Sequence, residues 1–315
     1  MLIHLNGQLV SRDQARVDPF DRGFLFGDGL YEGLRAFDGH VVGMARHVER
    51  LRSGLAEARI AWDAEALLGL TRELLDANSL RDAFIYWQVT RGVPAAGEPL
   101  RARVPSGAVR PTVFGYCLLA PALSAYSEPP TKTAITTRDM RWLRGRVKSI
   151  SLLGNVIASI EADDAGADDA VLVRDGLVAE GSSANLVAVV PDGDEGWEVV
   201  TPSLESAPML AGVTRDLLLA ANKDAGSRGV VIVERALTTT ELRRASEVML
   251  LGTLTMVTSI TKIDGRKVGD GSAGPVARSL LKSLVAVIGA ERVVEIDAKT
   301  RETSRAAWAS STARK

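Results

Sequence analysis

Near the start of the chain, apolar and polar residues alternate in short runs, which is typical of strands with one buried face. Two such runs meet at Asn6-Gly7 and two more at Asp38-Gly39, and both dipeptides favour the tight turns of hairpins. The first part of the chain is therefore expected to be rich in antiparallel strands.

Helical spacing follows these hairpins, because apolar residues recur every three or four positions in two consecutive segments. Runs typical of strands come next, and beyond a proline-rich stretch the two kinds of pattern are mixed. Hairpins together with helical crossovers predict a mixed α/β (α+β) fold rather than a doubly wound sheet. The clearest expected elements are helices over 46–58, 62–79, from about 214 and from about 276, and strands over 82–92 and 110–120.

A stretch without periodicity separates two parts of the chain. It contains Pro121, Pro129 and Pro130, and this composition is typical of an interdomain linker. The sequence predicts a smaller domain over 1–120, a linker over 121–134 and a larger domain over 135–300. The polar tail, 301–315, is expected to be disordered.

The composition narrows the class of partner. Of the 315 residues, 46% are apolar and 24% are charged, the balance of a soluble globular protein. Lys and Arg number 38 against 39 Asp and Glu, so no basic excess exists to hold nucleic acid or an anionic membrane. We therefore expect a small-molecule partner. No signal-peptide pattern and no apolar run long enough for a membrane span is present, which predicts a cytoplasmic protein.

The single cysteine, Cys117, lies in a run typical of a strand (TVFGYCLLA), so we expect a buried, inert thiol. One cysteine excludes an internal disulfide and a cysteine metal cluster. No metal site is predicted.

Two charged residues stand beside apolar runs. Lys148 precedes a run that reads as a helix, and apolar neighbours would desolvate its ammonium group, as a Schiff-base lysine requires. From its position alone, however, Lys148 also fits an ordinary charge at a helix start. Glu180 follows an apolar strand and precedes small residues (EGSSAN), which favours a buried, partnered carboxylate over a surface acid.

Three further segments are candidate anion sites. In LAGVTRDLLL, Thr214 directly precedes a helical pattern, so free backbone N–H groups and the positive end of the helix dipole point out together. In LLGTLTMVTS, Thr253 and Thr255 follow Gly252 at the end of a strand. Arg50 offers a guanidinium that suits phosphate, or it is one more solvated helix arginine. Threonines at helix starts are also common for structural reasons alone.

In order and spacing, these segments together resemble the class IV (fold type IV) pyridoxal-phosphate aminotransferases. That group holds D-amino-acid transaminases, branched-chain aminotransferases, (R)-amine transaminases and aminodeoxychorismate lyase. The resemblance spans residues 21 to about 260, and the matching stretches are DRGFLFGDGLYEGLRAFDG, HVERL, IYWQVTRG, VKSISLLGNVIA, VAEGSSANL, GVTRDLL and GTLTMVTSI.

The resemblance implies pyridoxal 5′-phosphate as the cofactor and a ping-pong transfer between an amino acid and a 2-oxo acid. Lys148 is similar to the Schiff-base lysine, which also moves the proton between the substrate Cα and the cofactor. Glu180 resembles the carboxylate facing the pyridine nitrogen, and Tyr31 an active-site tyrosine near the lysine. The phosphate cup and the cofactor's other hydrogen-bonding neighbours would then be Arg50, Val213, Thr214, Gly252, Thr253 and Asn185.

The substrate-pocket motifs resemble different members of the family. YEGLR, with Gly33 and Arg35, is similar to the branched-chain type, whereas IYWQVTRG, with Tyr86, is similar to the D-amino-acid type. In the D-amino-acid enzymes the next loop carries an Arg-x-His pair that holds the substrate carboxylate across a dimer interface. Here that loop has Arg101 and Arg103 but no histidine.

Enantiomer choice depends on where the substrate carboxylate binds, because the lysine attacks one fixed face of the cofactor. An arginine of the loop pointing inward favours a D-substrate. Backbone donors of the turn at Thr253 and Leu254 would favour an L-substrate instead, and Arg35 is a third candidate for the carboxylate. Solvated loop charges are the alternative reading of Arg101 and Arg103.

We therefore expect a D-amino-acid:2-oxo-acid transaminase, with tolerance of (R)-amines given the altered loop. A branched-chain L-amino-acid aminotransferase is the first alternative and an aminodeoxychorismate lyase the second. A pyridoxal-phosphate-binding module without turnover would need neither Lys148 nor Glu180. The resemblance implies a small α/β domain, a larger domain with a pseudo-barrel, and a homodimer with shared active sites.

Overall fold

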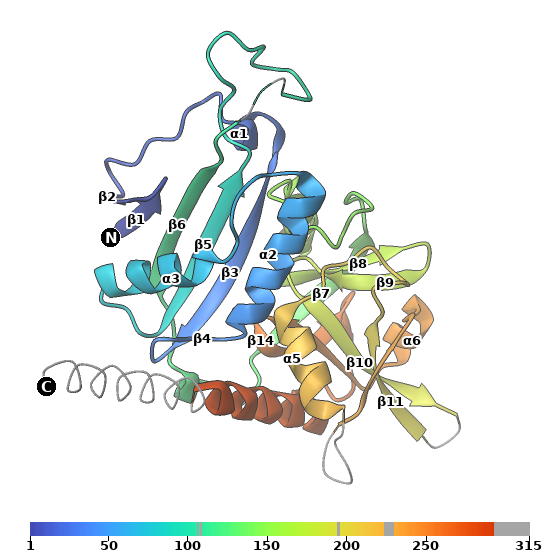
Figure 1. Ribbon diagram of the computed structural model, residues 1–315. Helices are drawn as coiled ribbons and strands as arrows, with labels where there is room; N and C mark the ends of the chain where they lie inside the picture. Colours follow the sequence, from blue (N-terminus) through green and yellow to red (C-terminus); the bar gives the residue numbers. More distant parts are fainter. Residues whose placement is uncertain (106, 108, 194–195, 224–229, 293–315) are drawn as a thin grey trace, which may run out of the picture.

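The computed structural model describes residues 1–105, 107, 109–193, 196–223 and 230–292. Two β-sheets lie side by side, one built from the first part of the chain and the other from the remainder (Figure 1). The expected mixed α/β fold is confirmed. The division into two domains stays a prediction, and its tail, 301–315, lies outside the described residues.

The first sheet is antiparallel throughout, in the order β2-β1-β6-β5-β3-β4. Both expected hairpins are confirmed: Asn6 and Gly7 have φ of 52° and 87° between β1 and β2, and Asp38 and Gly39 have φ of 50° and 79° between β3 and β4. These left-handed values match the right-handed twist of the paired strands. The strands are β1 (Leu2–Leu5), β2 (Gln8–Ser11), β3 (Gly29–Phe37), β4 (His40–Val41), β5 (Ala83–Thr90) and β6 (Thr112–Leu119).

Two helices cover one face of this sheet, α2 (Met44–Ala58) and α3 (Ala66–Ala77) (Figure 1). Their apolar residues, such as Leu51 and Leu74, form one core with the inward residues of the sheet. Cys117 on β6 belongs to this core at 1% exposure, as predicted. The short helix α1 (Arg22–Phe26) precedes β3 at one end of the sheet.

The connection to the second sheet is shorter than the predicted linker. After the 3-10 turn η1 (Leu123–Ala125), strand β7 (Thr131–Arg138) begins, so residues 131–134 already pair within the second sheet. Pro129 and Pro130 directly precede the first residue of this strand. Only the first part of 121–134 is therefore irregular.

The second sheet follows the order β12-β11-β10-β13-β14-β7-β8-β9, with β15 on β14. Three pairings are parallel, namely β11 with β12, β14 with β7, and β7 with β8, and the others are antiparallel. This mixture of parallel and antiparallel pairings agrees with the expected α+β fold. Its further strands are β8 (Asp169–Arg174), β9 (Leu177–Gly181), β10 (Asn185–Asp192), β11 (Gly196–Pro202), β12 (Ile232–Arg235), β13 (Glu247–Gly252), β14 (Met256–Ile263) and β15 (Arg266–Lys267).

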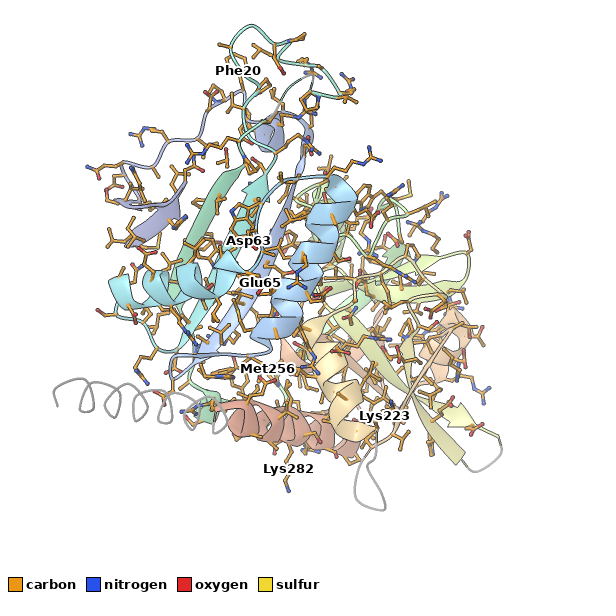
Figure 2. The ribbon with its side chains drawn as sticks, in the orientation of Figure 1. Phe20, Asp63, Glu65, Lys223, Met256 and Lys282 are labelled. Carbon is orange, nitrogen blue, oxygen red and sulfur yellow. The ribbon has the colours of Figure 1, made fainter. Side chains whose placement is uncertain are left out.

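Apolar cores lie on both faces of the second sheet. One core packs β10 and β13 against α5 (Val213–Asn222) and the final helix, described over 275–292. Leu280, Leu281 and Leu284 of that helix are buried, whereas Lys282 points away from the protein (Figure 2). The opposite core includes Leu242 of α6 (Thr239–Arg244).

Helix α4 (Leu153–Asp164) packs beside β7 and β8 through Ala158 and Ala162. All four of its large apolar side chains lie on the outside: Leu153, Val156, Ile157 and Ile160 are 71%, 49%, 47% and 53% exposed. Within the described ranges, every helix is too short or too polar to span a bilayer.

Candidate active site

A cavity of about 300 Å³ lies where the first sheet meets the second, beside Lys148. Its walls come from β3, α2, the segment before α4, the end of β9, the start of α5 and the β13–β14 turn. All of the predicted cofactor-binding residues line it, together with Tyr31: Arg50, Lys148, Glu180, Asn185, Val213, Thr214, Gly252 and Thr253.

Backbone pairing with the start of β3 positions Lys148. The Tyr31 N–H donates to the Lys148 carbonyl oxygen at 3.1 Å, and Ser149 forms a β-bridge with Leu30. Lys148 therefore lies in an extended segment, and α4 begins only at Leu153. This pairing brings the Lys148 Nζ to 4.1 Å from the centre of the Tyr31 ring.

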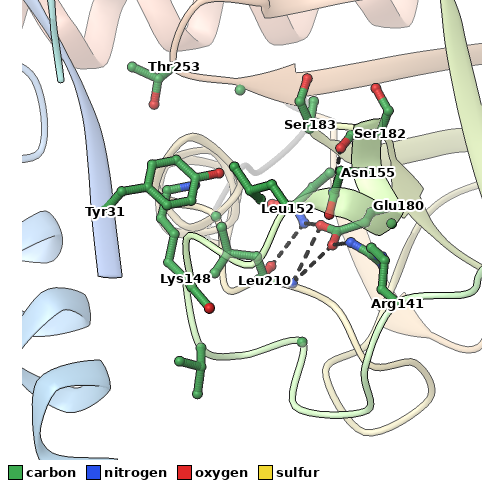
Figure 3. A pocket seen from close by; sticks show the side chains of 18 of the residues that line it. Tyr31, Arg141, Lys148, Leu152, Asn155, Glu180, Ser182, Ser183, Leu210 and Thr253 are labelled. Carbon is green, nitrogen blue, oxygen red and sulfur yellow. Dashed lines mark hydrogen bonds and ion pairs between the residues drawn. The ribbon is translucent and has the colours of Figure 1, made fainter. Parts of the chain in front are cut away.

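Glu180 lies across the cavity from Lys148, at the end of β9 (Figure 3). Its carboxylate accepts from Arg141 Nη1 at 2.6 Å and from Asn185 Nδ2 at 2.9 Å, and the Leu210 N–H lies 3.4 Å from both oxygens. Burial raises the pKa of Glu180, and the neighbouring Arg141 partly offsets this effect. The sequence-based prediction of a buried, partnered carboxylate is confirmed, since Glu180 is 5% exposed.

A buried charge cluster fixes Arg50. Its Nε and Nη2 donate to the two oxygens of Glu32 at 2.8 and 2.6 Å, and its Nη1 donates to the Ala211 carbonyl at 2.9 Å. His47 Nδ1 lies 2.7 Å from the same carboxylate. Burial alone would raise the pKa of Glu32, yet Arg50 and His47 lower it to about 2. Arg50 is thus held rigidly at the cavity wall.

The N-terminus of α5 opens onto the same cavity. Gly212 precedes the helix, and Val213 and Thr214 form its first turn, where backbone N–H groups have no partner inside the helix. A Cβ on Gly212 would collide with the Asn185 side chain, so this close approach requires glycine. Together with Thr253, the helix end forms a concave surface suited to an anion.

Arg35 lies elsewhere. Its side chain is directed into the protein, 2% exposed, where it donates to the Pro121 carbonyl oxygen and lies 4.4 Å from the Phe37 ring centre. It is absent from the cavity wall. The structure therefore does not bring Arg35 to the position expected of a substrate ligand, because the strand pairing buries that stretch of β3.

Two other predicted substrate residues lie near the cavity without lining it. Tyr86 stacks on Tyr31 with ring centres 5.7 Å apart and supports that ring from behind. Leu254 is 54% exposed at the tip of the β13–β14 turn, next to Thr253.

Arg101 and Arg103 lie in the long loop between β5 and β6, which projects from the upper end of the first sheet (Figure 1). Both guanidinium groups lie against the Phe26 ring, at 5.4 and 5.6 Å from its centre. Buried Arg22 anchors the loop by donating to the carbonyl oxygens of Ala102 and Arg103 at 2.6 and 2.8 Å. Neither arginine lines the cavity beside Lys148 of its own chain.

The sequence-based prediction missed Arg141, which contacts Glu180, and Glu32, which contacts Arg50. Glu32 had a signal: it alternates with Leu30 and Leu34 on the buried face of β3, so a charge there needs a partner. Arg141 stands among several arginines before Lys148, and nothing in the local pattern distinguishes it.

Comparison with known proteins identifies the family of the chain. A family model described as amino-transferase class IV matches residues 29–263. The D-alanine aminotransferase of Staphylococcus haemolyticus is 34% identical over 285 residues, covering 88% of this chain and 94% of the relative. The D-alanine aminotransferase of Bacillus licheniformis is also 34% identical, covering 90% and 96%.

Solved structures show the same fold. The branched-chain aminotransferase of Thermoproteus uzoniensis with norvaline superimposes with a TM-score of 0.78 at 25% identity, covering 92% of this chain and 95% of that one. A second branched-chain aminotransferase (T.th.), complexed with N-(5′-phosphopyridoxyl)-L-glutamate, superimposes with a TM-score of 0.77 at 28% identity. The match covers 91% of this chain and 94% of that one. The family model, the full-length relatives and the fold agree, and the chain belongs to the class IV aminotransferases.

Proposed function

We propose that this transaminase uses pyridoxal 5′-phosphate to move an amino group from a D-amino acid to a 2-oxo acid such as 2-oxoglutarate or pyruvate. The observation that carries the proposal is the meeting of Lys148 and Glu180 across one cavity that also contains Arg50 and the α5 N-terminus. The D-alanine aminotransferases at 34% identity support the D-amino-acid choice.

The residues of the cavity fit this cofactor at its polar groups. The Lys148 amine suits the aldehyde, and the buried Glu180 carboxylate suits a protonated ring nitrogen. Arg50, the first turn of α5 and Thr253 suit the phosphate. A branched-chain relative solved with a phosphopyridoxyl compound supports the same assignment.

The cofactor, when bound, supplies an electron sink for the negative charge that develops on the substrate Cα. Lys148 would hold the cofactor through Nζ, and the same atom would accept the proton from the substrate Cα. Glu180 keeps a proton on the ring nitrogen. The Tyr31 ring, 4.1 Å from Nζ, orients the amine and excludes water from one side of it.

We further propose a homodimer in which the β5–β6 loop of one copy reaches the cavity of the other. Arg101 and Arg103 are held away from their own cavity by Arg22, so a second copy is needed for either to bind the substrate carboxylate. Helix α4 supports an interface, because its exposed apolar residues 153, 156, 157 and 160 recur every three or four positions and form one stripe.

A branched-chain L-amino-acid aminotransferase is the second candidate. It is favoured by the resemblance of the YEGLR stretch, with Gly33, to the branched-chain type and by the fold shared with branched-chain enzymes. In that case the backbone of the Thr253–Leu254 turn, rather than a loop arginine, would bind the substrate carboxylate.

The test is a half-reaction screen of the full-length protein with pyridoxal 5′-phosphate, followed by the absorption of the bound cofactor. D-alanine should convert this absorption to that of the aminated cofactor, and L-leucine should not. An (R)-amine tests the breadth of the pocket. The reverse pattern would favour the branched-chain alternative, and release of pyruvate from aminodeoxychorismate would favour the lyase.

Replacing the proposed Schiff-base lysine tests the mechanism directly. Lys148→Ala should lose the cofactor's lysine-bound absorption and should reduce turnover by about 100- to 10,000-fold or more. Lys282→Ala, on the exposed side of the final helix, is the matched control and should retain both. A Lys148→Ala protein that kept its absorption and its turnover would refute the assignment.

A further inference from the structure

Behind Glu180 lies a row of alternating charges that the assigned chemistry does not use. Arg141 donates to Glu180 from Nη1 at 2.6 Å and to Asp139 from Nε at 2.9 Å. Arg174 Nη2 lies 3.4 Å from Asp139 Oδ2, an oxygen that also accepts from Arg141 Nη2 at 3.2 Å. Positive and negative charges therefore alternate along the row, which ends at the Glu180 carboxylate facing the cavity. The members in order are Arg174, Asp139, Arg141 and Glu180.

The row is largely sheltered from water. The side chains of Asp139, Arg141 and Glu180 are 0%, 12% and 7% exposed, so little solvent weakens the attraction between them. Arg141 also lines the cavity itself, beside Glu180 (Figure 3). Asp139 and Glu180 thus share one guanidinium, and a stronger bond to either carboxylate weakens the bond to the other.

We propose that Arg141 is a positioning residue that sets how readily Glu180 holds a proton, and through Glu180 the protonation of the cofactor's ring nitrogen. This inference rests on the proposed function of the cavity. The proton on the ring nitrogen comes either from the Glu180 carboxyl or from outside the protein, that is, from solvent or with the cofactor itself. Arg141 decides between them by fixing the charge on Glu180 before the cofactor arrives.

The physical argument follows from the groups that face Glu180. Burial favours the neutral carboxylic acid, whereas Arg141, the Leu210 N–H and the more distant charge of Lys148 favour the carboxylate. Asn185 donates to the second oxygen, and Arg50 lines the same cavity. Arg141 is the cation in direct contact, so its removal should have the largest effect.

A purely structural clamp is the competing explanation. Arg141 also approaches the Pro208 carbonyl oxygen at 3.4 Å and closes the turn from Asp139, so its loss would loosen the segment that leads to Lys148. Loosening alone would weaken cofactor binding at every pH. It would not change the number of protons exchanged on binding, and that number is the quantity to measure.

The experiment titrates the cofactor-free, full-length protein with pyridoxamine 5′-phosphate by calorimetry. Buffers that differ in ionisation enthalpy give the number of protons taken up from solvent at each pH. In Arg141→Met, Glu180 holds its proton to higher pH and passes it to the ring nitrogen, so fewer protons come from solvent. The pH at which Glu180 loses its proton should rise by about 1 to 3 pH units.

Two further variants keep the proposal falsifiable if Arg141→Met fails to fold. Asp139→Asn leaves Glu180 as the carboxylate paired with Arg141. The pH at which Glu180 loses its proton, the midpoint of its titration, should therefore fall, which is the opposite direction. Arg141→Lys keeps the positive charge, so the pH at which Glu180 loses its proton should stay close to the wild-type value. Arg146→Met, an exposed arginine of the same segment, is the matched control and should not move the midpoint.

Equal proton uptake in the wild type and Arg141→Met, or shifts of the same sign in Arg141→Met and Asp139→Asn, would overturn the role of Arg141 alone. The proposed function would remain, because binding itself would be intact. A wild-type protein that does not bind pyridoxamine 5′-phosphate would overturn the proposed function and this inference together.

Discussion

Glu32→Gln tests whether the buried cluster under Arg50 stabilises the protein as its geometry indicates. The Glu32 side chain is 0% exposed and accepts two hydrogen bonds from Arg50, with His47 on the same carboxylate. Glutamine keeps nearly the same shape but removes the charge. Arg50 would then be left as a buried cation without its carboxylate.

The size of the effect follows from the pKa of Glu32, which falls from 4.5 to about 2 in the folded protein. At about 1.4 kcal/mol per pKa unit, the ionised form is stabilised by roughly 3 kcal/mol relative to the unfolded chain. Because the folded pKa is the lower one, this contribution is fully present above pH 4.5 and is lost as the pH falls toward 2. Removing one partner of a buried pair costs about 3 to 5 kcal/mol, a similar magnitude.

The assay is urea unfolding of the wild type and of Glu32→Gln at a series of pH values. At neutral pH the variant should be about 3 to 5 kcal/mol less stable. The difference should shrink as the pH falls from 4.5 toward 2, because the wild type loses the same charge there. Glu49→Gln, whose partner Arg52 is exposed, is the control and should change stability by less than about 1 kcal/mol.

Two results would contradict the reasoning. One is a Glu32→Gln protein as stable as the wild type at neutral pH, which would show that the pair contributes no more than its neutral counterpart. The other is a stability difference that stays constant down to pH 2, which would show that the ionisation of Glu32 is not its source.

Three further predictions concern the cofactor cradle, a helix and acid stability. Gly212→Ala should weaken pyridoxal 5′-phosphate binding by about tenfold or more, measured by fluorescence titration, because the new Cβ collides with Asn185, which orients Glu180. Gly69→Ala, in α3 with open space around its Cα, should instead raise stability by about 0.5 to 1 kcal/mol in thermal unfolding. Burial lowers the pKa of His47, so the wild type loses stability as the pH falls below 6.5 and the unfolded chain takes up the proton. His47→Gln should lose less stability over that range in urea unfolding, and an unchanged slope would contradict this account.

Local patterns were sufficient for most of the elements. Asn6-Gly7 and Asp38-Gly39 produce their hairpins because both residues of each turn adopt left-handed backbone angles, a property of the turn alone. The spacing of apolar residues likewise predicted α2 and α3 within a few residues of their observed bounds, and the start of α5 within one residue. Boundaries were less well determined near Lys148, where the backbone pairs with β3 before α4 begins.

The candidate site depended on a different kind of information. Lys148 and Glu180 carried local signals, but neither signal could show that they face one cavity. The bridge between Leu30 and Ser149, a contact between distant parts of the chain, fixes the backbone beside Lys148 at the start of β3. The resemblance to class IV aminotransferases indicated the cofactor-binding residues in advance, and all of them line the cavity together with Tyr31. Five of the substrate residues that it indicated do not line it: Arg35, Tyr86, Arg101, Arg103 and Leu254.

Charged residues show most clearly what the tertiary structure alone decided. Arg35, expected at the substrate, is buried against Phe37, and Arg101 and Arg103 lie on Phe26 outside their own cavity. Arg141, with no distinguishing local pattern, contacts Glu180 at 2.6 Å. An apolar residue shows its environment through periodicity, because burial drives its placement. An arginine takes its role from the carboxylate or ring that the folded backbone brings beside it, and that partner is set by strand register rather than by neighbours in sequence.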